Sequence, residues 1–420
     1  MDLSYTTRAT CRACGEGDLT FLFSLGEQYV SNFVKREHIH SGPKAPLELV
    51  LCCKCSLVQL KHTAPQEFLY KRHYWYRSAR NATMVKALRD ITTDIESRVE
   101  LNPGDVVLDI GSNDGTLLRA YTKPGIRRIG IEPANNLATL DNYAGLELVH
   151  DFWPVTPHKA RESNAFVAKP FMAKVITAIG MLYDLEDPNA FIAAMARTLA
   201  PGGLLVAQLM CLKNMVALAD VGNFCHEHLE YYSLESLVRL LAKHGLEIID
   251  LQTNLVNGES YRLYVGHRPC DQPTLAQPAF TSALAEEKRL ELDNQDTYKR
   301  LYSRMTYNKN QCVSFINQEV SKGKSVWVYG ASTKGNTILQ YYGLDNKLIT
   351  GAADRSPEKW DLYTIGTGIP IHSEYAARQQ KPDYFLVLPY AFLDEFMERE
   401  KKWRAGGGRF IVPLPDFRVV

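Results

Sequence analysis

The sequence predicts an α/β protein in three parts: a cysteine-rich N-terminal lobe, a central parallel sheet and a second, smaller α/β unit. Five of the nine cysteines stand within the first 55 residues. A buried strand followed by a glycine-containing loop and a helix start occurs twice, at 106–118 and 325–336. At 420 residues the chain exceeds the size at which one hydrophobic core keeps growing, so several packed units are expected.

Composition and charge narrow the class of protein. Hydrophobic residues make up 45% of the chain and charged residues 23%, which is ordinary for a globular protein. A formal charge of +1 provides no field for polyanions, so we expect no nucleic-acid partner. No signal peptide and no segment of membrane-spanning length is evident. We therefore expect a cytoplasmic protein without a membrane partner, whose cysteines stay reduced and serve metal binding or packing.

The N-terminal cysteines form two C-x2-C knuckles. Each knuckle brings two thiolates to one face of a tight turn, and two knuckles supply the four sulfurs that tetrahedral zinc accepts. The expected ligands of Zn2+ are Cys11, Cys14, Cys52 and Cys55. Cys53 is assigned to packing, because pairing it with Cys55 would leave only C-x-C. A small sheet is expected between the knuckles, with strands at 47–51 and 57–60. The alternative is a set of incidental buried cysteines.

The central unit begins with a helix expected over 79–99, followed by a strand over 106–110. The loop after that strand has the spacing G-x-x-x-G, with Gly111 and Gly115, and lets the backbone approach a ligand at a helix N-terminus. The next strand, 128–132, ends in Glu132, where doubly wound folds place the carboxylate that accepts hydrogen bonds from ribose hydroxyls. Together these signals predict a nucleotide-type ligand.

Further strands are expected at 146–152, 173–178 and 204–208, with a helix over 188–199. Alternating strands and helices predict a parallel sheet whose ligands lie at the carboxyl ends of its strands. This pattern resembles the class I methyltransferase fold, which binds S-adenosylmethionine. The expected donor-binding residues are Asp109, Gly111, Ser112, Asn113, Gly115, Glu132, Asp151 and Phe152. The alternative is a doubly wound domain for another nucleotide.

The C-terminal third is expected to contain one long helix over 280–322 and then a second strand–loop–helix unit. Additional strands are expected at 348–354, 384–388 and 409–413. The loop with Ser332, Thr333 and Lys334 would cradle a substrate phosphate. In the alternative interpretation, Lys334 is a solvated residue at a helix start.

A polar cluster over 223–233 is the candidate for chemistry. Its histidines, His226 and His228, flank Glu227 at i and i+2, which does not match the H-E-x-x-H metal helix, so no metal is assigned. A histidine titrates near neutral pH and can remove a proton from a carbon beside a carbonyl, while a carboxylate fixes its tautomer. The alternative is a buried structural histidine pair. A helix is expected to begin just after Ser233.

Nearly the whole chain resembles the nucleotide-sugar (TDP-deoxysugar) C-methyltransferases. The resemblance is carried by the knuckles and by the segments 74–78, 108–115, 226–229, 257–263 and 328–336. It implies a zinc-binding lobe over 1–75, a methyltransferase core over 76–270, a helical linker over 271–322 and a substrate-binding Rossmann-like domain over 323–420.

The resemblance also implies methylation of a carbon beside the keto group of a nucleotide-linked 4-keto-deoxysugar, a small-molecule acceptor. By position, His228 would be the base, Glu227 its partner and Tyr76 a substrate-contacting hydroxyl. The other implied substrate contacts are His226, Ser332, Lys334 and Asn336.

Two positions depart from the family. Cys225 replaces a tyrosine, and Tyr183 and Asp184 stand where a histidine is common. O- or N-methylation of another small metabolite is therefore the alternative activity, and a donor-binding regulatory protein without activity is a further class. The sequence predicts no oligomeric state.

Overall fold

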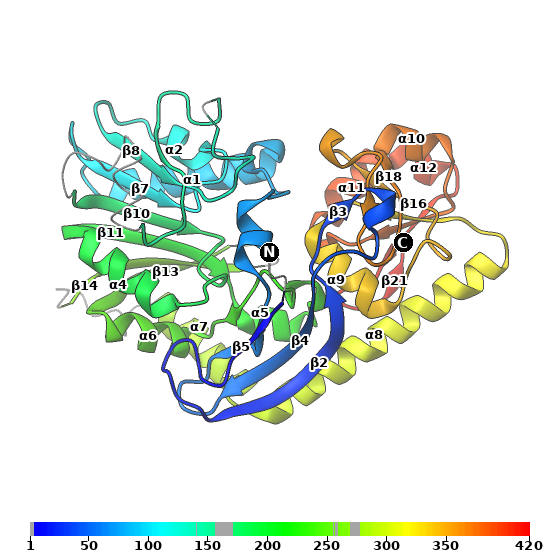
Figure 1. The fold of residues 1–420 in the computed structure, drawn as a ribbon, viewed down its shortest axis with the longest axis horizontal. Helices are drawn as coiled ribbons and strands as arrows, with labels where there is room; N and C mark the ends of the chain where they lie inside the picture. Colours follow the sequence, from blue (N-terminus) through cyan, green and yellow to red (C-terminus); the bar gives the residue numbers. More distant parts are fainter. Residues whose placement is uncertain (1–3, 140, 156–170, 255, 257–258, 269–277) are drawn as a thin grey trace.

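The computed structural model describes residues 4–139, 141–155, 171–254, 256, 259–268 and 278–420. Two α/β units stand side by side, and the strands of the N-terminal lobe together with one long helix run along both of them (Figure 1). Within the described ranges, no helix combines the length and the apolar character that crossing a bilayer requires. The predicted α/β class and its three parts are confirmed.

The central unit is built on a seven-stranded sheet in the order β13-β14-β11-β10-β7-β8-β9. The strands from β11 to β9 pair in parallel, whereas β14 and β13 run antiparallel and close one edge. Burial of whole strands such as β7 explains their continuous apolar sequence. The bounds are β7 Val106–Ile110, β8 Arg127–Ile131, β9 Glu147–Val149, β10 Ala173–Ile179, β11 Leu199–Met210, β13 Leu246–Asn254 and β14 Ser260–His267.

The helices of this unit begin where their capping residues predict. Helix α1 (Ala82–Arg98) starts after Asn81, whose side chain accepts from two backbone N–H groups. Helix α6 (Leu234–Lys243) starts after Ser233, as expected. The remaining elements of this unit are α2 Thr116–Ala120, α4 Pro188–Thr198, α5 Leu212–Ala217, β12 Glu230–Tyr231, the 3-10 turns η3 Ser78–Arg80 and η4 Val221–Asn223, and the π-helical turn η2 Glu67–Lys71.

The N-terminal lobe is a small antiparallel sheet in the order β12-β5-β4-β2, so one of its strands comes from the central unit. The predicted strands at 47–51 and 57–60 correspond to β4 and β5. The bounds are β1 Thr6–Thr7, β2 Leu19–Tyr29, β3 Phe33–Val34, η1 Arg36–His38, β4 Lys44–Cys52, β5 Val58–Leu60 and β6 His62–Thr63.

Arg12, which lies inside the first cysteine knuckle, joins the lobe to the central unit. The side chain is almost fully buried and donates to the Leu60 carbonyl at 2.5 Å and to Thr63 Oγ1 at 2.6 Å. Its guanidinium also lies 4.0 Å from Glu230 and 3.4 Å from Glu186 of the central unit. A buried arginine of this kind is retained only with such compensation.

The C-terminal unit contains a sheet in the order β18-β16-β15-β19-β20-β21, parallel except for its last strand. The strands expected near 325, 348, 384 and 409 are present. The bounds are β15 Val326–Tyr329, α9 Thr333–Tyr342, β16 Gly351–Asp354, η7 Pro357–Lys359, β17 Tyr363–Thr364, β18 Ile371–Ser373, α10 Glu374–Gln379, β19 Tyr384–Val387, η8 Tyr390–Phe392, α11 Leu393–Arg399, α12 Lys401–Ala405, β20 Arg409–Val412 and β21 Arg418–Val419.

The expectation of one helix over 280–322 is wrong. Two helices, α7 (Pro278–Leu290) and α8 (Gln295–Ser321), flank a turn. Glu291 has a φ of 52° there, and the Asn294 side chain caps α8. The turn lets α7 pack on the central unit while α8 follows the lobe and the C-terminal unit, where its apolar face joins their shared core.

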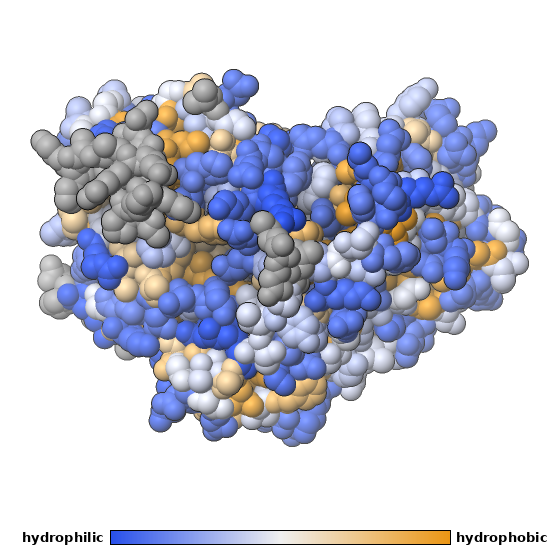
Figure 2. All heavy atoms as spheres, viewed as in Figure 1, coloured by the Kyte–Doolittle hydropathy of each residue, from blue (hydrophilic) through white to orange (hydrophobic). Residues whose placement is uncertain are grey.

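The lobe contributes to two cores. Its cysteine end packs with the central sheet, and its strands β2 and β4 pack with α8 and the C-terminal unit. Strand β3 also pairs with β17 of the C-terminal unit. The face of the molecule that is seen in the view of Figure 1 is largely hydrophilic, with apolar side chains in scattered groups (Figure 2). The three parts are thus joined through shared cores.

Candidate functional site

A cavity of about 610 Å³ opens at the carboxyl ends of the central strands. The ends of β7, β8, β10 and β11 form its floor, and segment 66–78 forms one wall. The 225–228 loop and Thr333 with Lys334 of the C-terminal unit complete it. Three parts of the chain therefore meet around one cavity, as expected for ligands at the carboxyl edge of a parallel sheet.

The floor of the cavity contains two buried carboxyl groups. Glu132 Oε2 accepts from the Asn113 N–H and Oε1 accepts from the Ala134 N–H, each at 2.8 Å. Asp109 Oδ1 accepts from Thr177 Oγ1 at 2.6 Å. Burial raises the pKa of each carboxyl to about 7. Both groups are thus poised to gain or lose a proton near neutral pH.

Hydrogen bonds and left-handed backbone conformations fix the shape of the glycine-rich loop. Ser112 Oγ lies 2.6 Å from the Tyr143 hydroxyl, and Asn113 adopts a φ of 54°. Gly111 lines the cavity with a φ of 71°, and a Cβ there would lie 3.1 Å from Met181. Gly115 does not line the cavity: its φ is 73° and it packs against Leu146. Its role is to turn the chain into α2.

Segment 74–80 forms a strap between the glycine-rich loop and the C-terminal unit. Asn113 Oδ1 accepts from the Ser78 N–H at 3.0 Å, and its Nδ2 donates to the Tyr76 carbonyl at 3.1 Å. On the other side, Arg80 forms an ion pair with Glu358 at 2.8 Å. The Tyr76 side chain lines the cavity and is 44% exposed. Asp151 and Phe152 also line the cavity.

His228 is the base candidate with a defined tautomer. Its Nδ1–H donates to the Asn223 carbonyl at 2.9 Å, which leaves Nε2 as the unprotonated nitrogen. The ring lines the cavity and packs edge-on against Tyr183, with 4.6 Å between ring centroids. Burial, reinforced by the charge of Lys334, holds the pKa of His228 well below its usual range. The imidazole is therefore neutral at neutral pH.

The expected pairing of Glu227 with His228 is not formed, because the Asn223 carbonyl takes that place. Glu227 lines the cavity, and burial raises its pKa. The backbone carbonyl of Glu227 accepts a hydrogen bond from the Tyr70 hydroxyl, which ties the loop to the wall. A backbone carbonyl such as that of Asn223 leaves no signal in the sequence, so the hydrogen-bond partner of His228 could not be predicted.

Three residues expected to contact substrate, His226, Ser332 and Asn336, are not among the residues that line the cavity. His226 is buried and its Nε2–H donates to the Ala45 carbonyl at 2.9 Å. Ser332 caps α9 by accepting from the Gly335 N–H, and Asn336 donates to the Asn32 carbonyl at 3.0 Å. The hydrogen bonds of these three residues fix the backbone around them, whereas Lys334 lines the cavity.

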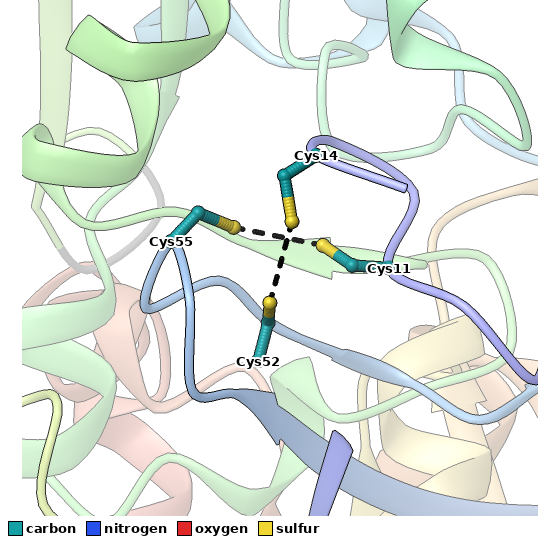
Figure 3. Close-up of side chains that lie close together, drawn as sticks. All are labelled: Cys11, Cys14, Cys52 and Cys55. Atoms are coloured by element: carbon teal, nitrogen blue, oxygen red, sulfur yellow. Dashed lines mark hydrogen bonds between the residues drawn. The ribbon is translucent and has the colours of Figure 1, made fainter. Parts of the chain in front are cut away.

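The four predicted cysteine sulfurs lie within 4.8 Å of one another and point to a common centre (Figure 3). Cys11 and Cys55 are 3.6 Å apart, and Cys14 and Cys52 are 3.4 Å apart. Zinc–sulfur bonds of about 2.3 Å in a tetrahedron place sulfurs about 3.8 Å apart, so this donor set fits zinc. The assignment of Cys53 to packing is wrong: Cys53 is exposed and its sulfur lies 3.1 Å from Thr20 Oγ1.

Comparison with protein families assigns each part of the chain. Residues 11–70 match "Putative zinc binding domain", residues 71–251 match "Methyltransferase domain" and residues 255–415 match "C-methyltransferase C-terminal domain". The C-methyltransferase NovU of Streptomyces niveus is 29% identical over 98% of this chain and 96% of its own length. The chain is an S-adenosylmethionine-dependent methyltransferase that is similar over nearly its whole length to a C-methyltransferase.

Other proteins match a smaller share of this chain. A ubiquinone biosynthesis O-methyltransferase of Xanthomonas oryzae pv. oryzae is 29% identical over 35% of this chain and 61% of its own length. A solved structure of magnesium protoporphyrin IX methyltransferase from Synechocystis covers 44% of this chain and 87% of that chain, at 15% identity and a TM-score of 0.31.

Proposed function

We propose that this methyltransferase methylates a carbon beside the keto group of a nucleotide-linked 4-keto-deoxysugar. The observation that supports it most is His228, a neutral imidazole whose tautomer is fixed and whose ring lines the cavity. Heteroatom methylation of a hydroxyl needs no carbon acid, whereas a C–H beside a carbonyl must lose its proton to a base. The full-length similarity to a C-methyltransferase supports the same chemistry. We infer a cytoplasmic enzyme, where the zinc thiolates stay reduced.

The donor is assigned to the carboxyl ends of β7, β8 and β9. S-adenosylmethionine supplies an electrophilic methyl group when it is bound. Glu132 is placed to accept from the ribose hydroxyls, because each of its oxygens keeps a second lone pair beside the backbone N–H that it already binds. Asp151 and Phe152 suit the amino group and the face of adenine. Gly111 leaves space for close approach of the donor.

The acceptor is assigned to the other end of the cavity. His228 Nε2 removes the proton from the carbon, and the bonding pair forms an enolate. The walls exclude water and hold the carbon in line with the methyl group, an orientation effect that can supply about 7 kcal/mol or more. Tyr76 is placed to contact the acceptor from the strap. In the zinc lobe, the four thiolates play no part in the chemistry and stabilise the lobe.

Replacing Glu132 by glutamine is expected to weaken binding of S-adenosylhomocysteine at least tenfold, because a charged acceptor for two ribose hydroxyls is lost. Binding by the unmodified protein should also weaken as the pH falls below about 7, since the carboxyl then becomes protonated. Titration calorimetry measures both effects. Glu147→Gln, at the far end of the neighbouring strand β9, is the matched control. Unchanged affinity in Glu132→Gln would contradict this donor site.

The activity is tested with dTDP-4-keto-6-deoxyglucose in heavy water. In the presence of S-adenosylhomocysteine, the protein is expected to exchange the hydrogen beside the keto group for deuterium, which NMR detects. With a 13C-methyl donor, the new group should appear on carbon. A product methylated on oxygen, with no deuterium at any carbon, would support the O-methyltransferase alternative that the Xanthomonas relative represents.

A further inference from the structure

Lys334 is the one charged side chain that the described C-terminal unit contributes to the cavity. It lies in the first turn of α9, which stands at the edge of that unit facing the central sheet (Figure 1). Its Nζ lies 3.4 Å from Met210 Sδ, at the end of β11. A positive charge in the first turn of a helix is unfavourable, so the helix itself does not stabilise the ammonium of Lys334.

The ammonium lacks a close counter-ion. Across the described ranges, no carboxylate oxygen lies within 4.0 Å of Lys334 Nζ. The nearby carboxyl groups are Asp184, Glu227 and Asp220, and burial raises the pKa of all three, that of Asp184 well above its usual range. None of them forms an ion pair with Lys334. A half-buried cation without an ion-pair partner favours an anion in the cavity.

The positive charge of Lys334 also acts on His228. Burial lowers the pKa of His228 most, and the charge of Lys334 lowers it further. The other groups around His228 are the Asn223 carbonyl, the Tyr183 ring, the buried Cys225 thiol, Asp184 and Glu227. None of these brings a positive charge. A cation and a neutral base therefore share this end of the cavity.

We propose that Lys334 supplies, from the C-terminal unit, the positive charge that stabilises the enolate oxygen while His228 removes the proton from the adjacent carbon. In this step the C–H bond breaks, its electron pair forms the C=C bond, and the carbonyl π pair moves to oxygen. The proton goes to His228 Nε2, where it exchanges with solvent, and the ketone is restored when a proton returns to the carbon or when that carbon takes the methyl group of the donor. This proposal rests on the proposed carbon methylation and gives the second domain a part in the chemistry.

The proposed acceptor has two groups that can carry negative charge near Lys334, the enolate oxygen and the diphosphate. Loss of Lys334 would lower the rate in the first case and the affinity in the second. Stabilising charge that develops in a transition state typically contributes about 100-fold or more to the rate. A diphosphate contact contributes equally to ground state and transition state and changes affinity alone. The measurement must therefore separate the exchange rate at saturation from binding.

The test is Lys334→Met in the full-length protein, with dTDP-4-keto-6-deoxyglucose and S-adenosylhomocysteine in heavy water. We expect deuterium exchange at saturation to fall about 100-fold or more, while thymidine diphosphate binds with unchanged affinity by calorimetry. The rising limb of the exchange rate should move to higher pH, because the charge that lowers the pKa of His228 is gone. Lys334→Arg should recover part of the rate.

Lys347→Met, an exposed lysine beyond the end of α9, is the matched control and should behave like the unmodified protein. Two results would overturn the role of Lys334 in the enolate step. One is unchanged exchange at saturation with weakened binding of thymidine diphosphate, which assigns Lys334 to the phosphates. The other is no change in either quantity. If the unmodified protein itself fails to exchange, the proposed carbon methylation fails instead.

Discussion

Replacement of His228 by alanine is expected to reduce methyl transfer about 100-fold or more, because a positioned general base typically contributes that much. The Asn223 carbonyl holds Nδ1–H, so only Nε2 is available to the substrate. Binding of S-adenosylhomocysteine should persist, since Glu132 and the glycine-rich loop lie on other strand ends. Turnover and calorimetry on the same preparation measure the two effects.

The pH dependence adds an independent test of this role. The low pKa of His228 keeps its imidazole neutral, so the rate should rise through a pKa below 6.5 and then level off. His38→Ala removes an exposed histidine and should leave the profile unchanged. Retention of most activity in His228→Ala, or a profile without that acid limb, would contradict the assignment.

Simultaneous replacement of Cys14 and Cys52 by serine is expected to abolish zinc binding, from one ion per chain to none. These residues face each other across the centre of the cluster (Figure 3). Structural zinc contributes about 10 kcal/mol or more to folding of its own module. The lobe should therefore unfold locally and become sensitive to proteolysis. Elemental analysis and limited proteolysis provide the measurements.

Cys53→Ser is the matched control, because Cys53 lies within the second knuckle but its side chain is exposed outside the cluster. It should keep one zinc ion and normal stability. Stoichiometric metal in the double variant would show that other residues bind the ion. Loss of metal in Cys53→Ser would contradict the choice of Cys52 and Cys55.

The main sheet and the metal cluster could be predicted because their signals are local. Continuous apolar strands, glycine-rich loops and paired knuckles each follow from a few adjacent residues. The antiparallel strands β13 and β14 were not predicted, since nothing in their sequence marks the reversal of direction. The break between α7 and α8 depends on Glu291 and Asn294, which interrupt a segment of otherwise helical composition.

Within the site, strand geometry predicts which residues at strand ends line the cavity, whereas the contacts of loop residues could not be predicted. The positions of Glu132 and Asp109 follow from strand geometry, and both line the cavity. His226 and His228 are two positions apart in an irregular loop, where periodicity gives no orientation. The fold alone decides that one faces the cavity and the other the Ala45 carbonyl. Such distinctions depend on tertiary packing.

The short strand β12 has a consequence for the engineering of hybrid enzymes. It follows His228 by two residues and pairs with β5 of the lobe, while the Leu60 N–H donates to the Leu229 carbonyl at 2.9 Å. The lobe thus provides part of the backbone frame of the loop that carries His228. A chimera that exchanged this loop between two relatives would have to bring the matching lobe strands with it. Lobe and loop should therefore be transplanted together as one unit.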